Sequence, residues 1–248
     1  KYVDTSRNIN RAGREMGIRR LMSINLMKRL ESSVESFRLT VGRVKQLIDS
    51  TIAEIDAYTS GGYSVIDGRE LTGDADFDDD DRNTEYFAAE HSIKIDLGDM
   101  DYKTWRDRLS EDSEELALLK MLIDDITPKH DTKLQTLFGL IEGKLMNPIN
   151  DGNRKILIFS AFSDTAEYLY HHVSSFVKSK FGLDTAMITG SVDGKTTIKG
   201  QRASMNEVLT LFSPISKDKN LLMPNNTADI SVLIATDCIS EGQNLQDC

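Results

Sequence analysis

The sequence predicts an α/β protein in which a mainly helical N-terminal region precedes a parallel β-sheet with flanking helices. Two observations indicate this class. Residues 18–58 carry apolar side chains at helical spacing, and after residue 150 three short apolar runs alternate with helical stretches. A strand–helix–strand–helix–strand order is typical of parallel sheets with right-handed crossovers. We therefore expect a helical region over residues 1–130 and an α/β region over residues 131–248.

The first stretch, residues 18–58, contains no proline and predicts either one long helix or two helices in series. Its basic side chains are spread around the helix, so they form either a solvated face or a face that contacts phosphates. These basic residues are Arg19, Arg20, Lys28, Arg29, Arg38 and Arg43.

Residues 61–85 interrupt the helical pattern with glycines and a run of aspartates, which predicts a mobile acidic insertion without a catalytic role. A calcium loop is the sharper alternative. The turn position of such a loop requires glycine, whereas this sequence has Asp79. The residues at the other template positions are Asp74, Asp76, Asp78, Asp80 and Glu85.

Two more helices are expected before the sheet, over Glu111–Ile126 and Asp131–Lys144, and each ends shortly before a proline. The predicted strands then follow at Lys155–Ala161, Asp184–Thr189 and Ile230–Thr236. Helices are expected between them, at Asp164–Lys180 and Lys199–Phe212, and should cover both faces of the sheet.

Ligands of parallel sheets bind beyond the carboxyl ends of the strands. In this chain that location holds Ser160, the Thr189-Gly190-Ser191 segment and Thr236-Asp237. The segment from Gly190 to Thr196 imitates a phosphate-binding loop, but only three residues separate its glycines where four are needed. A variable loop is the better interpretation.

Composition narrows the function classes. The chain has 248 residues, 39% of them apolar, and no apolar run approaches the roughly 18 residues of a membrane span. Two cysteines without zinc spacing indicate a reducing, cytoplasmic setting, and the four scattered histidines suggest no metal site. The net charge of −10 is uneven: residues 1–45 carry 11 basic and 4 acidic residues. A basic surface for nucleic acid therefore stays possible.

The last predicted strand and the residues after it carry the most specific pattern. The strand ends in Ala235-Thr236-Asp237, and Glu241-Gly-Gln-Asn244-Leu follows a short turn. This resembles motif V of superfamily 2 helicases and translocases. Upstream, Lys155-Ile-Leu-Ile-Phe-Ser-Ala161 resembles motif IV, the first strand of the second RecA-like lobe.

Three further segments agree with that order. Gly190-Ser191, then Gln201-Arg202, then Leu211-Phe212 resemble the stretch between motifs IV and V, and Asp131-Thr-Lys133-Leu134 resembles the entry helix of this lobe in Swi/Snf-type translocases. The helix containing Asn25–Ser33 resembles the region before the lobe in bacterial Swi/Snf-like proteins, including the RNA-polymerase-recycling group.

The resemblance implies an incomplete RecA-like sheet and an ATP-dependent motor that moves on nucleic acid, with DNA favoured. ATP and Mg would be bound mainly by the first RecA-like lobe of the same protein. The implied nucleic-acid-binding residues are Ser160, Thr189, Gly190, Ser191, Arg202 and Thr236. The implied nucleotide-binding residues are Asp237, Glu241, Gly242, Gln243 and Asn244.

The sequence contains no Walker A loop, no Walker B box and no motif VI arginine. We therefore expect a fragment that begins within a longer protein, carries no catalytic residue and hydrolyses no ATP by itself. An RNA helicase and a non-enzymatic α/β nucleic-acid-binding or scaffold domain stay open as alternatives. A small-molecule enzyme is disfavoured, because no nucleophile with a base stands at a strand end.

Overall fold

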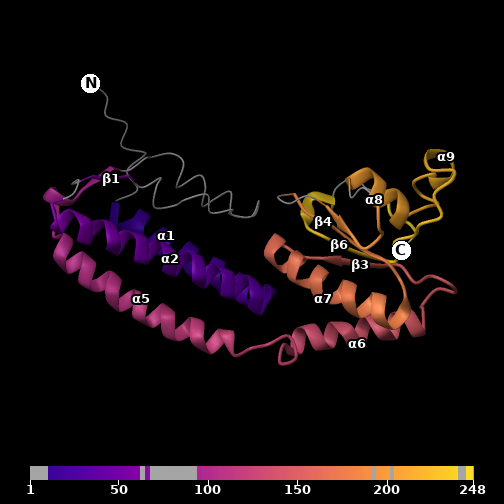
Figure 1. Ribbon diagram of the computed structural model, residues 1–248, viewed down its shortest axis with the longest axis horizontal. Coiled ribbons are helices and arrows are strands. Elements are labelled where there is room, and N and C mark those ends of the chain that lie inside the picture. The colour runs from indigo at the N-terminus through magenta and orange to yellow at the C-terminus, as the bar shows by residue number, and fades with distance from the viewer. Residues whose placement is uncertain are drawn as a thin grey trace, which may run out of the picture.

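The computed structural model describes residues 11–61, 65–67, 94–190, 194–201, 204–239 and 244–247, and all structural findings concern these residues. Figure 1 shows an elongated helical arm beside an α/β unit. The arm contains α1 (Arg11–Ser32), α2 (Val34–Thr59), β1 (Val65–Asp67), β2 (Lys94–Asp96), the 3-10 turn η3 (Leu97–Asp99) and α5 (Tyr102–Asp124). The α/β unit contains α6 (Thr132–Met146), β3 (Ile156–Phe159), α7 (Ser163–Phe181), β4 (Thr185–Ile188), β5 (Lys195–Thr196), α8 (Met205–Phe212), α9 (Lys219–Leu222), β6 (Val232–Ala235) and the 3-10 turn η4 (Asp237–Ile239).

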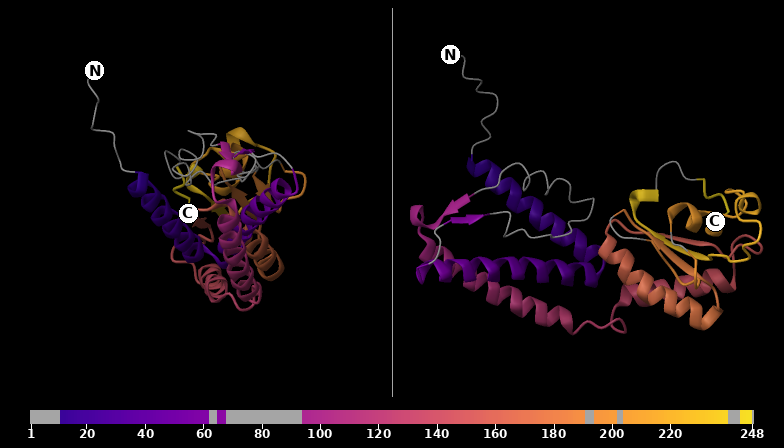
Figure 2. Two further views of the ribbon diagram at one scale, coloured as in Figure 1. Left: turned by 90° about the vertical axis from the view of Figure 1, so that its left-hand side faces the viewer. Right: turned by 45° about the horizontal axis from the view of Figure 1, so that its top comes forward.

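The first helical stretch forms two helices, and the break lies at Ser33. This residue has an extended backbone, and its hydroxyl accepts a hydrogen bond from the Ser36 amide at 3.0 Å. Serine is a strong N-cap because it satisfies an amide that has no partner within the helix. The two helices therefore meet at an angle instead of continuing in one line (Figure 2).

Helices α2 and α5 pack side by side along the arm, and the antiparallel β1–β2 pair lies at their far end (Figure 2). Buried Ile55 and Leu97 form the centre of a small apolar cluster there, together with partly buried aromatic side chains. Polar contacts join the two helices along the rest of their length. Arg38 donates to the carbonyls of Ile123 and Ile126, and Ser113 donates to Asp49 at 2.6 Å.

The predicted strands form one sheet, with the order β3-β6-β4-β5. β3, β6 and β4 are parallel neighbours, which confirms the expected parallel arrangement. β5 was not predicted. It lies in the segment interpreted as a variable loop and pairs antiparallel with β4, so the sheet is mixed.

Alternate residues of β6 face opposite sides of the sheet. Val232 and Ile234 pack in a cluster with α6 and α7, whereas Leu233 and Ala235 pack with α8. Cover on both faces is therefore confirmed, and α6 shares its face with α7 (Figure 1).

Two predicted boundaries were wrong. α8 begins at Met205 instead of Lys199, and Gly200 before it has a φ of +74° that a right-handed helix cannot contain. α5 begins nine residues earlier than predicted, at Tyr102, because the Asp101 side chain caps it by accepting from the Thr104 amide. Asp131 caps α6 in the same way, and the predicted start of that helix is confirmed.

None of the helices in the described ranges is both long enough and apolar enough to cross a membrane. The aspartates and Glu85 of the possible calcium loop lie outside the described residues.

Candidate nucleic-acid interface

Three hydroxyl-bearing residues directly follow the three parallel strands. The register pairs Phe159 and Ile188 with Ala235, so the residues that come next lie side by side in sheet order. The Ser160 amide donates to the Ala235 carbonyl at 2.9 Å, and the Thr236 amide donates to the Ile188 carbonyl at 3.2 Å. The structure therefore brings Ser160, Thr236 and Thr189 together at one edge, as the sequence predicted.

These three residues are sheltered, because each is only 8% exposed. The Ser160 hydroxyl is already used within its own turn: it donates to the Phe162 carbonyl at 3.0 Å and accepts from the Phe162 amide at 3.2 Å. A ligand that accepts from Ser160 must therefore replace the bond to Phe162. The strand-end residues are therefore recessed and do not form an open row on the surface.

The other predicted site residues have different surroundings. Gly190 and Asp237 are exposed just beyond strands β4 and β6, and Asn244 is exposed in the last described segment. That segment is tethered by Asp247, which accepts from the amides of Ile215 and Ser216 at 2.7 and 3.1 Å. Five of the predicted site residues lie outside the described residues: Ser191, Arg202, Glu241, Gly242 and Gln243.

The segment that imitates a phosphate-binding loop is built differently from such a loop. Lys195 belongs to β5, where it pairs with Met187, and its ammonium donates to Glu167 at 2.8 Å. In a P-loop the corresponding lysine opens a helix and reaches a phosphate. Lys195 is therefore placed differently from the lysine of a P-loop, and residues 191–193 of this segment lie outside the described residues.

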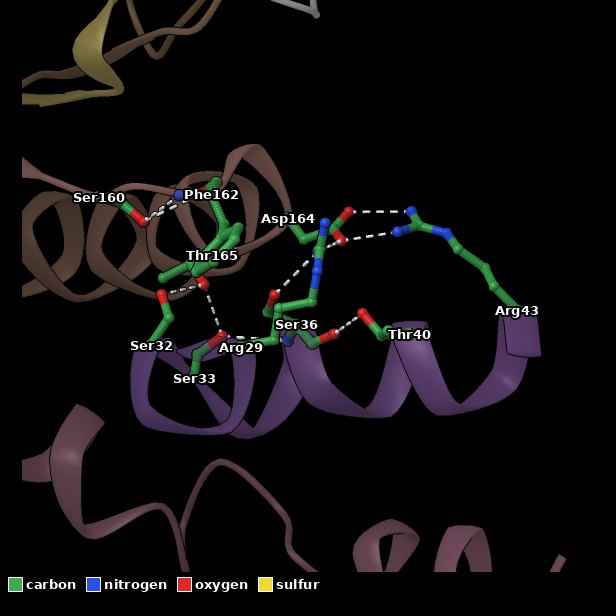
Figure 3. A network of polar contacts seen from close by, with 10 residues as sticks. All are labelled: Arg29, Ser32, Ser33, Ser36, Thr40, Arg43, Ser160, Phe162, Asp164 and Thr165. Atoms are coloured by element: carbon green, nitrogen blue, oxygen red, sulfur yellow. Dashed lines mark hydrogen bonds and ion pairs between the residues drawn. The ribbon is translucent and has the colours of Figure 1, made fainter. Parts of the chain in front are cut away.

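The turn from β3 into α7 also contacts the helical arm, which the sequence did not indicate (Figure 3). Asp164, in the first turn of α7, accepts from two arginines of the arm. The Oδ2 atom lies 3.1 Å from Nη1 of Arg29 and 2.9 Å from Nη1 of Arg43, and Oδ1 lies 3.1 Å from Nη2 of Arg43. The guanidinium of Arg29 also lies over the Phe162 ring, 4.7 Å from its centroid.

Hydroxyl groups complete this joint between the arm and the α/β unit. The Oγ atoms of Ser32 and Ser33 each lie 2.8 Å from Oγ1 of Thr165. Ser33 and Thr165 are 6% and 4% exposed, and Arg29 is 3% exposed. The joint is therefore buried around Arg29, Ser33 and Thr165, where hydrogen bonds are strong and a missing partner is costly.

The joint changes the interpretation of the basic residues in the arm. Arg29 and Arg43 bind Asp164, and Arg38 binds Glu35 and Asp124. Each of these three arginines is paired with a carboxylate. They therefore form neither a simple solvated face nor a face shown to contact phosphates. No local sequence pattern marks Arg29 or Asp164, since the two are 135 positions apart.

A cavity of about 770 Å³ lies beside Ser160, between the end of α1, the start of α6 and the end of β3. Its charged lining residues are two lysines and two carboxylates, Lys28, Lys133, Glu31 and Asp131. Lys133 donates to the carbonyls of Glu31 and Ser32, and Asp131 accepts from Tyr168 at 2.9 Å. Burial and this hydrogen bond raise the pKa of Tyr168 well above its usual value. The lining is balanced in charge and is not a cationic pocket.

Within the described part of the chain, no group of three or more His, Cys, Asp or Glu side chains is placed to hold a metal ion. His171 and His172 stack edge to face at 4.9 Å, and burial lowers the pKa of His172. Neither histidine belongs to a candidate metal site.

Comparison with known proteins adds no assignment. No protein-family model matches the chain, and no curated protein matches it. A functional assignment therefore depends on the geometry of the strand ends and of the joint.

Proposed function

We propose that this chain is part of an ATP-dependent translocase or helicase of superfamily 2 that moves on nucleic acid, with DNA favoured. In this proposal the α/β unit is the first half of the second RecA-like lobe, and the protein acts in the cytoplasm. The observation that carries the proposal is the alignment of Ser160, Thr236 and Thr189 at neighbouring carboxyl ends. In open α/β sheets, ligands bind at that edge.

The proposed contacts are hydrogen bonds to the sugar–phosphate backbone. Hydroxyls and backbone amides at strand ends can grip phosphates without reading base sequence. One neutral hydroxyl–phosphate bond contributes on the order of 1–2 kcal/mol. A phosphate that accepts from Ser160 must displace the Phe162 carbonyl, to which this hydroxyl donates.

The proposed nucleotide contacts lie after β6. Asp237, the segment 241–243 and Asn244 carry the resemblance to motif V, in which a glycine allows close approach of the main chain and an amide can bond ribose hydroxyls. ATP and Mg would be held mainly by the first lobe of the same protein. Phosphoryl transfer depends on positioned metal, lysine and arginine groups, and this chain lacks the motifs that supply them.

Two experiments test the proposal at different levels. The purified chain should bind short oligonucleotides and should hydrolyse no ATP above background. In the full-length protein, Thr236→Ala should weaken nucleic-acid binding about tenfold and should reduce stimulated ATP turnover more strongly, because coupling needs both lobes aligned.

Asn244→Ala in the full-length protein tests the nucleotide side of the same proposal and should reduce stimulated turnover without an equal loss of binding. Unchanged stimulation in both variants would show that Thr236 and Asn244 are structural. Nucleic-acid-stimulated turnover by the purified chain alone would contradict the assignment of the catalytic groups to other parts of the protein.

A further inference from the structure

The turn between β3 and α7 is short, and it links the proposed nucleic-acid site to the helical arm. Ser160 stands at its first position, and the contacts to the arm lie on Phe162 and, in the first turn of α7, on Asp164 and Thr165 (Figure 3). Ser160 and Phe162 are joined by two hydrogen bonds. The hydroxyl proposed to meet a phosphate is therefore two residues from a side chain that the arm covers.

The N-cap residue of α7, Phe162, supplies no side-chain cap to the helix. Polar caps normally satisfy the first amides of a helix and fix its start. The start of this helix is instead held by the arm, whose arginines pair with Asp164 and whose serines hydrogen-bond to Thr165.

The two arginines hold Asp164 unequally. Arg43 uses two nitrogens in a fork that contacts both carboxylate oxygens, and its side chain is 38% exposed. Arg29 uses one nitrogen, and its side chain is 4% exposed. A buried guanidinium cannot lose its carboxylate without a large penalty, so separating the arm from the turn is costly.

We infer that Asp164 is a positioning residue: through Arg29 and Arg43 it couples the strand-end hydroxyl of Ser160 to the helical arm. This inference rests on the proposed nucleic-acid function and adds a means of regulating the same site. Ligand binding at the strand ends and the orientation of the arm then depend on each other, because the turn cannot shift without disturbing the Asp164 contacts.

For one substitution, simple charge repulsion and loss of positioning predict opposite changes in the affinity for nucleic acid. Asp164→Asn removes a negative charge close to the proposed phosphate path, so simple charge repulsion predicts tighter binding of nucleic acid. Loss of positioning predicts weaker binding, because the neutral amide no longer holds two guanidinium groups. The direction of the change therefore separates the two explanations.

The test measures the dissociation constants of the wild-type chain and its variants for a short DNA duplex and for a DNA single strand by fluorescence anisotropy. Asp164→Asn should weaken binding by about threefold or more. Asp229→Asn is the matched control, since it also removes one carboxylate, from an ion pair with Lys155 at the opposite end of the sheet. It should leave affinity unchanged or slightly increase it.

Two further variants exclude a merely structural effect. Asp164→Glu keeps the charge and should restore most of the affinity. Arg43→Lys also keeps the charge but loses the two-nitrogen fork, so it should weaken binding in the same direction as Asp164→Asn. Thermal melting is recorded for every variant, and Arg43→Lys carries the test if Asp164→Asn is unfolded at the assay temperature.

Equal or tighter binding by Asp164→Asn, or by Arg43→Lys in its place, overturns the inference while the proposed function stands. Failure of the proposed function is a different result, in which the wild-type chain binds neither probe. The inference then falls with the function on which it rests.

Discussion

The helical arm and the α/β unit are stabilised in different ways. In the α/β unit, ten buried side chains form a cluster on one side of the sheet and eight form another on the opposite side. In the described part of the arm, the apolar cluster has only two buried members, Ile55 and Leu97. Large apolar side chains of α5 are exposed, among them Leu118, Met121 and Leu122 at 59–65%. Apolar burial therefore dominates in the α/β unit, whereas the arm depends more on contacts between charged and polar groups.

The stability of the two regions should therefore respond to different perturbations. Burial of apolar surface involves no titrating group and is not screened by salt, whereas ion pairs between exposed groups are weak and screened. Core substitutions should therefore be most costly in the sheet, and changes of charge should act first on the arm.

Leu233→Ala in the central strand β6 should have the largest effect on stability. Leu233 is 0% exposed between two parallel neighbours, so the cavity cannot close easily, and we expect a loss of about 4 kcal/mol in the free energy of unfolding. Urea denaturation measures it. Ile55→Ala is the matched change in the arm, where Ile55 is also 0% exposed, and should cost about 2–3 kcal/mol because its partly buried neighbours can relax. Equal losses at the two sites would contradict the contrast.

Arg29→Ala should destabilise the joint by about 3 kcal/mol, because it removes a buried partner of Asp164 and the contact with the Phe162 ring. Hydrogen exchange should locate the effect: amides around Ser33 and at the start of α7 should exchange faster, and those of β6 should not change. Arg20→Ala, on the exposed part of α1, is the control and should leave exchange unaltered. Faster exchange throughout the sheet would show that the joint and the α/β core are one cooperative unit.

Acid should loosen the arm before the sheet. Hydrogen bonds lower the pKa of four arm carboxylates below the ordinary value of 3.8. Since these pKa values are lower in the folded state than in the unfolded state, the carboxylates add stability above about pH 4, and this stability is lost as the pH falls through the folded values. The residues are Asp49, Asp56, Asp101 and Asp124.

Trp105 is the single tryptophan of the chain and packs against the apolar cluster of the arm, so its fluorescence reports on that region. In a titration from about pH 5 to 2, this fluorescence should change before the β6 amides lose their protection from hydrogen exchange. Simultaneous loss of the two signals would contradict the prediction.

Alkali should act on the α/β unit instead. Burial raises the pKa of Tyr168 and Tyr170 above 10.0, so the folded state keeps both protonated and loses stability as the pH rises above that value. Lys155 opposes this trend, because burial lowers its pKa from 10.5. Tyr168→Phe should make the decline of melting temperature above about pH 10 less steep. An unchanged slope would remove Tyr168 as its cause.

Lys195→Gln should have the smallest effect. Its ion pair with Glu167 is 2.8 Å long, but the two side chains are 44% and 40% exposed, so we expect a change below about 0.5 kcal/mol. Urea denaturation again provides the measurement. A loss above about 1 kcal/mol would show that the β4–β5 hairpin depends on this pair and that surface charge matters in the α/β unit as well.

The sequence predicted the central part of the sheet correctly because the signals there are local. Apolar runs at residues 156–159, 185–188 and 232–235 are short, β-branched and separated by helices, so strand identity, parallel direction and the shared carboxyl edge followed from them. That edge holds Ser160, Thr189 and Thr236 as expected.

The joint and β5 could not be predicted in the same way. β5 has two residues and depends on pairing with β4, which no local pattern encodes. The link between Arg29 and Asp164 spans 135 positions, and an isolated basic residue in a helix has the same appearance whether it meets solvent, phosphate or a distant carboxylate. Non-local ion pairs become visible only when packing brings their elements together.

The bend between α1 and α2 has a consequence for how the arm forms. The Ser33 hydroxyl accepts from the Ser36 amide and also meets Thr165 of α7, so one atom serves both the local helix start and the contact with the α/β unit. Residues 18–58 contain no proline to force a break, and apolar residues continue at helical spacing across it. The bend therefore depends in part on tertiary contacts, because its full set of hydrogen bonds exists only when the arm and α7 are together. We therefore expect the angle between α1 and α2 to be fully fixed only when the arm packs against α7.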